Sequence, residues 1–147
     1  MKSVREALTG ADRGSVLRDV VALIDSEVSK KSGLSGMALK GGYKVVKKLK
    51  GGRMVHAATD HMLNDFTEAI APLHEEFVSA GQGSFDDFLR VNNGRAAEAL
   101  LGITDVRAAK AQHKVLKKTY SKLRPQAVGH VKEALPALGR LVEKYTG

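Results

Sequence analysis

Five side chains between residues 56 and 68 have the types and the spacing that can ligate a metal ion. His56 and Asp60 lie four residues apart, as do His61 and Asp65, so each pair would share one face of a helix. The two pairs are rotated by about 140° from each other and therefore do not converge on one ion. Glu68 extends the second pair to three ligands, but this spacing also arises often from surface ion pairs. We therefore predict no metal site and no cofactor.

The side-chain arrangements used by most enzymes are missing. The chain has no cysteine, which excludes disulfides, thiolate catalysis and cysteine-based zinc sites. The adjacent acids Glu75-Glu76 and Asp86-Asp87 would point in different directions on a helix, so neither pair forms a two-carboxylate acid–base site. No serine lies in a Gly-x-Ser-x-Gly elbow, and no glycine cluster matches a phosphate loop or a dinucleotide fingerprint. We expect no catalytic residues and no enzymatic activity.

Charge is strongly segregated along the chain, which has a net charge of +8. Residues 28–59 contain eight bases and no acid, and residues 106–132 again contain eight bases and no acid. Such segregation creates a local positive field that attracts phosphates and other anions. We predict that two basic helix faces bind nucleic acid or another polyanion with weak specificity, through Lys40, Lys44, Lys47, Arg107, Lys110, Lys114, Lys117 and Lys118.

Three other interpretations remain open. Both basic faces are compatible with simple solvation, and the chain is also compatible with a protein–protein interaction or oligomeric module that has no nucleic-acid role. Reversible binding at an anionic membrane surface is the third, because basic amphipathic helices suit it. The apolar arcs of these helices lack large aromatic residues, and we expect the core to bury them, which argues against a membrane role.

The first basic face belongs to a helix that we expect from about Ser35 to Gly51-Gly52. Helical spacing places its lysines opposite an apolar arc with small residues in its middle. Glycine inside a helix costs about 1 kcal/mol relative to alanine, so we predict that another helix packs closely here, in preference to a backbone that contacts a ligand or phosphate. The glycines concerned are Gly36, Gly41 and Gly42, and the full arc is Leu34, Met37, Ala38, Gly41, Gly42, Val45 and Leu49.

The remaining apolar periodicity predicts the rest of an all-α fold. A long core helix is expected at 53–80, kinked or split at Pro72. We expect the second basic helix from Asp105 to about Leu123, capped by Thr104, and a last helix at about 126–145.

Together these elements predict a single domain over residues 1–147, a bundle of six or seven helices around the long one. Residues 1–14 are expected to form a loosely ordered N-terminal segment. No stretch resembles a signal peptide or a transmembrane helix, and we expect a cytoplasmic location.

Two segments carry a resemblance to known proteins. GLSGMALKGGYKVVKKLKGG (33–52) and ALLGITDVRAAKAQHKVLKKTYSKLRP (99–125) resemble a family of small uncharacterised bacterial proteins, chiefly from actinobacteria, known as a domain of unknown function. The resemblance covers about Ser15 to Tyr145. It implies a free-standing helical protein of bacterial origin and carries no activity or site residues.

Overall fold

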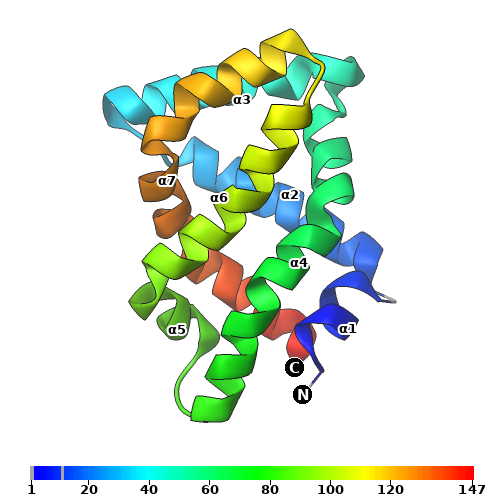
Figure 1. Cartoon of the computed structure of the whole chain (residues 1–147), viewed down its shortest axis with the longest axis vertical. Helices are drawn as coiled ribbons and strands as arrows, with labels where there is room; N and C mark the ends of the chain where they lie inside the picture. The colour runs from blue at the N-terminus through cyan, green and yellow to red at the C-terminus, as the bar shows by residue number, and fades with distance from the viewer. Residues whose placement is uncertain (1, 11) are drawn as a thin grey trace.

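The protein is a bundle of α-helices. The computed structural model describes residues 2–10 and 12–147, and this part of the chain forms seven helices and no strand. The predicted all-α bundle is therefore confirmed, with the long α4 running through it (Figure 1). The helices are α1 (Val4–Thr9), α2 (Arg13–Ser29), α3 (Gly33–Gly52), α4 (Met54–Ala80), α5 (Phe85–Val91), α6 (Asn93–Lys110) and α7 (Lys114–Thr146).

The core lies between α4 and the helices around it. Ile70, Leu73 and Phe77 of α4 belong to one buried apolar cluster with Phe85 and Leu89 of α5, and the last two side chains are fully buried. Ser84 caps α5 by accepting a hydrogen bond from the Asp87 backbone N–H, which holds the short helix in register. Burying large apolar side chains in this way supplies most of the favourable free energy of folding.

Pro72 does not divide α4, which is one helix from Met54 to Ala80. The proline lies on the exposed side of the helix, while Ala71 and Leu73 on either side of it are buried. Packing of the buried face therefore outweighs the hydrogen bond that the proline removes. Of the two predicted effects of Pro72, a kink or a split, the split is wrong.

The predicted boundaries of the last two helices are also wrong. α6 continues through Thr104 to Lys110, and the Thr104 hydroxyl donates to the Leu101 carbonyl oxygen instead of capping a new helix. The chain breaks after Lys110, where Ala111 adopts an extended conformation, and α7 then continues through Pro125. A proline inside a helix bends it, and Figure 1 shows α7 running first beside α3 and then turning toward the C-terminus.

The N-terminal segment is part of the core in the described residues. Ser3 caps α1 through the Glu6 backbone N–H, and Val4 and Leu8 of α1 are buried in the core cluster. The backbone N–H of Lys2 donates to the carbonyl oxygen of Thr146 at 3.0 Å, which joins the two ends of the chain. Because Val4 and Leu8 pack in the core, the start of the chain contributes to the bundle's stability.

The rotation of α3 differs from the prediction. The apolar arc expected to be buried is largely exposed, with Leu34 90% and Met37 68% accessible. The helix is fixed instead by a neighbouring face, on which Gly42 contacts α7 and the Tyr43 hydroxyl donates to Asp25 of α2. The side chains that lie at least half-buried on this face are Leu39, Tyr43, Val46 and Leu49. The polar contact of Tyr43 therefore overrides the burial that the apolar pattern alone predicts.

Candidate polyanion-binding face

The two basic segments meet at one end of the bundle. α3 and the first part of α7 lie side by side and run in opposite directions, as their colours in Figure 1 show. They approach closely at Gly42, where an added Cβ would lie 2.9 Å from Cδ1 of Leu123 and 3.0 Å from Cγ2 of Thr119. A Cβ at this position would have to displace the ends of the Leu123 and Thr119 side chains, so glycine allows the closest approach of the two helices. We refer to α3 and residues 114–124 of α7 as the α3/α7 layer.

The glycines of α3 have different surroundings. A Cβ on Gly36 would lie 2.9 Å from the Lys31 backbone, so this glycine also marks a close approach. No atom lies within 4 Å of a Cβ placed on Gly41, which faces solvent. The prediction of close packing is therefore wrong at Gly41, because the helix is rotated so that Gly42 alone of the pair meets α7.

The outer side of the α3/α7 layer is covered by lysines. Six of them are exposed and form no ion pair with any acid in the part of the chain that the structure describes. An ammonium group without a neighbouring carboxylate keeps its full charge available to an incoming anion. These six residues, which we call the lysine face, are Lys40, Lys44, Lys48, Lys114, Lys118 and Lys122.

Four of the eight basic residues predicted to bind a polyanion do not belong to the lysine face. Lys47 lies 3.3 Å from a carboxylate oxygen of Asp25 and 5.8 Å from the ring centroid of Tyr43. Lys117 donates to the Ala109 carbonyl oxygen at the end of α6. The remaining two, Arg107 and Lys110, lie on α6 and not on α7.

Lys48 and Lys122 were missed by the sequence interpretation. Lys48 falls at the edge of the apolar arc, which the sequence wrongly assigned to the core. Lys122 is not among the basic residues predicted for one face of a helix that starts at Asp105, whereas α7 starts at Lys114. Which lysines are exposed depends on the rotation of each helix about its axis. The apolar pattern alone did not determine that rotation.

Folding neutralises part of the charge that is segregated in the sequence. Lys31 is only 6% exposed, and its ammonium group lies 2.9 Å from a carboxylate oxygen of Glu133 on α7. The hydrogen bond and charge of Lys31 hold the pKa of Glu133 below its usual range. Arg124 pairs with Asp105 in the same way, at 2.8 Å. The six residues of the lysine face are among the bases that form no ion pair in the described part of the chain.

Two tyrosines anchor the α3/α7 layer to the helices beneath it. Tyr43 donates to Asp25 of α2, and the hydrogen bond lowers the pKa of that carboxyl group. Tyr120 donates to Asp105 of α6, whose pKa is lowered by Arg124 and by this hydrogen bond. Burial raises the pKa of both phenols. Both rings are partly buried with their hydroxyls bonded, so neither is placed to stack on a nucleic-acid base.

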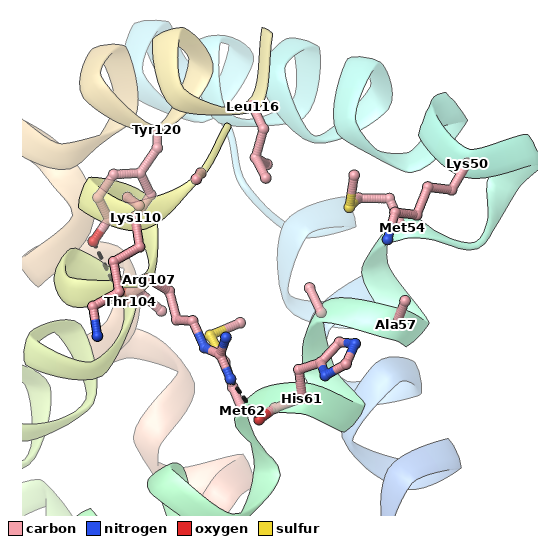
Figure 2. Close-up of a pocket in the computed structure, with 13 residues that line it drawn as sticks. Lys50, Met54, Ala57, His61, Met62, Thr104, Arg107, Lys110, Leu116 and Tyr120 are labelled. Carbon is pink, nitrogen blue, oxygen red and sulfur yellow. Dashed lines mark hydrogen bonds between the residues drawn. The ribbon is translucent and has the colours of Figure 1, made fainter. Parts of the chain in front are cut away.

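A cavity of about 300 Å³ lies beneath the layer, between α3, α4, α6 and α7 (Figure 2). Its lining is mostly apolar, with Met54 and Met62 from α4 and Leu116 from α7. The lining includes three cations and no acid, and one of them, Arg107, donates to the His61 carbonyl oxygen at 3.1 Å. Such a lining suits an apolar molecule that carries a negative group. The other two cations are Lys50 and Lys110.

The side chains considered as metal ligands lie on the exposed side of α4. Asp60 pairs with Arg13 at 3.1 Å, and Glu68 pairs with Arg5 at 2.8 Å. Within residues 2–10 and 12–147, no group of three or more histidines and acids is arranged to hold a metal ion. These acids contribute instead to ion pairs between α4 and the N-terminal helices.

Comparison with known proteins identifies a family and no function. Across the described chain, none of the helices has the length and apolar character needed to cross a membrane. No curated protein and no solved structure matches the sequence. A family model matches residues 4–146, nearly the whole chain. The resemblance to a domain of unknown function is therefore confirmed, and the chain belongs to the family of unknown function DUF6918.

Proposed function

We propose that this protein binds polyanions on the lysine face and has no enzymatic activity. One observation carries the proposal: two helices from distant parts of the chain lie side by side and present, at one end of the molecule, six lysines that form no ion pair with the described residues. A polyanion that contacts these ammonium groups releases its condensed counterions, which favours binding at low salt.

The chemistry of the face favours weak specificity. Lysine is a point charge on a flexible stem, so it contacts phosphate or sulfate groups without reading base edges. Tyr43 and Tyr120 are bonded to aspartates and do not offer stacking surfaces. Binding is therefore expected to follow the charge density of the polyanion more than its sequence.

A pair of triple variants tests this proposal. Lys44→Gln/Lys114→Gln/Lys118→Gln removes three charges from the lysine face, and all three side chains are exposed. The matched control, Lys2→Gln/Arg90→Gln/Arg140→Gln, removes three exposed charges from elsewhere on the molecule. Both variants lower the net charge of +8 by the same amount. The probes are labelled duplex DNA and heparin, titrated by fluorescence anisotropy at about 50 and 200 mM salt.

The first triple variant should bind both probes more weakly and reduce the slope of log affinity against log salt by about 3 for DNA. The control should leave affinity and slope close to those of the wild type, because its charges lie away from the face. Equal losses in the two variants would show that only net charge matters and would contradict a defined binding face. No binding of either probe by the wild type at low salt would also contradict the proposal.

A further inference from the structure

Apolar side chains are exposed among the lysines of this face. Leu34, Met37 and Val45 of α3 are 90%, 68% and 45% accessible, and Val115 of α7 is 44% accessible. The other large apolar residues with comparable exposure are single valines on α4, α5 and α6. Isolated exposed apolar residues are normal, but a group of them on one helix marks an interaction surface.

The apolar residues form a strip along α3. Leu34, Gly41 and Val45 follow one another at helical spacing and lie on the same face, close to the side on which Gly42 meets α7. Lys40 and Lys44 fall on the far side of this strip. Thr119 and Leu123 of the antiparallel neighbour α7 contact the Gly42 side of this strip, and helical spacing places Lys114, Lys118 and Lys122 on the exposed side of α7 beyond that contact. An apolar strip therefore lies between two rows of lysines on the outside of the α3/α7 layer.

This combination distinguishes between classes of polyanion. A nucleic acid offers phosphates to the lysines and has no complement for exposed leucine and methionine side chains at the level of its backbone. The surface of an anionic membrane offers both, because phosphate headgroups lie beside the start of the hydrocarbon region. We infer that the lysine face docks on an anionic lipid membrane, with Leu34 and Met37 inserted between the headgroups; this inference rests on the proposed function.

The composition of the strip sets the strength of docking. It contains no aromatic residue, and its middle is Gly41 and Ala38, so the apolar contribution alone is small. The lysines alone attract the protein to an anionic surface but do not insert. Both contributions are needed, so docking is reversible, depends on anionic lipid and weakens with salt.

The test compares two probes on two matched variants. Leu34→Gln/Met37→Gln removes the most exposed apolar residues of the strip, and Val78→Gln/Val91→Gln removes two exposed apolar residues elsewhere, on α4 and α5. Vesicles of phosphatidylcholine alone and with about one-third phosphatidylglycerol are used in flotation and titration assays. Labelled duplex DNA is titrated in parallel, and sedimentation reports the oligomeric state of each protein.

The wild type should bind the anionic vesicles and leave the neutral ones unbound. Leu34→Gln/Met37→Gln should weaken vesicle binding at least about tenfold, while its affinity for DNA stays within about twofold of the wild type. The Val78→Gln/Val91→Gln control should behave as the wild type with both probes. The lysine triple variant should lose affinity for both.

Three results would overturn the inference. Binding of DNA without binding of anionic vesicles would assign the face to nucleic acid and leave the proposed function intact. Vesicle binding that is unchanged in Leu34→Gln/Met37→Gln, or a wild-type dimer that this variant dissociates, would show that the strip has another role. Binding of neither DNA nor vesicles would remove the inference and the proposed function together.

Discussion

The two ends of the bundle use their charged residues differently. At the end that holds both termini and α5, exposed cations pair with acids, as in Arg5 with Glu68 at 2.8 Å and Lys144 with Asp19 at 2.8 Å (Figure 1). At the other end, the lysine face has no such partners in the described chain. Exposed ion pairs stabilise a fold only slightly, and unpaired like charges oppose it slightly. The lysine face therefore gains no stability from exposed ion pairs, and this is the basis of the proposal that it binds an external anion.

The apolar residues show the same contrast. Phe85, Leu89 and Val142 are fully buried toward the end that holds the termini, whereas Leu34 and Met37 of the α3/α7 layer face solvent. A leucine that faces water contributes nothing to the stability of the fold through burial. The buried side chains near the termini therefore stabilise the fold, whereas the exposed apolar residues of the α3/α7 layer do not.

Two leucines of identical chemistry give the largest expected difference between the regions. Leu89→Ala should lower the free energy of unfolding by about 3–5 kcal/mol, because it removes a fully buried side chain and leaves a cavity. Leu34→Ala should change it by less than about 0.5 kcal/mol, because the side chain is 90% exposed. Urea unfolding followed by circular dichroism measures both values. A similar loss of unfolding free energy in both variants would show that Leu34 is buried, which would contradict its exposed position on α3.

A glycine pair gives the next largest difference. A Cβ on Gly139 of α7 would lie 2.5 Å from Cα of Asp86, and backbone at the start of α5 cannot move away easily. Gly139→Ala should therefore destabilise the protein by about 2–3 kcal/mol. At Gly42 the obstructing atoms are the far ends of Leu123 and Thr119, so Gly42→Ala should cost about 1 kcal/mol or less. Thermal unfolding of the two variants tests this order, and a larger loss at Gly42 would reverse it.

Alanine substitution of the neighbouring glycines Gly41 and Gly42 in α3 should affect the stability of the protein differently. Gly41→Ala should stabilise the protein by about 0.5–1 kcal/mol, because alanine favours the helix and nothing lies within 4 Å of the new methyl group. Gly42→Ala gains the same helix preference but must displace Leu123, so it should show no gain. Chemical unfolding of the pair decides the rotation of α3. A loss at both positions would mean that the helix is turned toward the predicted arc, and a gain at Gly42 would mean that this residue does not contact α7.

The smallest effect concerns the aspartates that anchor the layer. The pKa values of Asp25 and Asp105 are lowered in the folded state, so the stability they add is present above their ordinary pKa of about 3.9 and is lost as the pH falls below it. Both carboxylates are about two-fifths exposed, which limits each contribution to about 1 kcal/mol or less.

Asp25→Asn/Asp105→Asn should therefore be less stable than the wild type at pH 7, and the gap in stability should narrow at about pH 3, where the carboxylates begin to be protonated. Urea unfolding at both pH values measures the gap, and asparagine keeps the shape of the side chain and one acceptor oxygen. A gap that stays constant with pH would show that the carboxylate charge does not contribute.

Much of the fold could be predicted from the sequence, because strong apolar periodicity determines a long helix. α4 and α3 were predicted to within a few residues of their ends. The boundary between α6 and α7 could not be predicted, because Thr104 and Asp105 resemble a helix start and their partners Tyr120 and Arg124 come from the next helix. Proline was likewise overvalued, since packing carries α7 through Pro125.

The sequence predicted that a basic surface exists, but it predicted only some of the residues on the lysine face. Charge segregation along the chain indicated a basic surface, and folding then removed Lys31 and Lys47 from the unpaired set through Glu133 and Asp25. Those contacts join distant parts of the chain, so no local pattern reveals them. The rotation of α3 was missed for the same reason, and with it the exposed strip that begins at Leu34.

We propose that polyanions bind at one end of the molecule. The reactivity of individual lysines tests this binding position most directly. The rate of acetylation of each lysine, followed by mass spectrometry with and without heparin, reports which ammonium groups an anion covers. Protection should be concentrated on the six residues of the lysine face, while Lys2 and Lys30 react as in the free protein. Equal protection of all lysines, or protection at Lys2 and Lys30 alone, would contradict the claim.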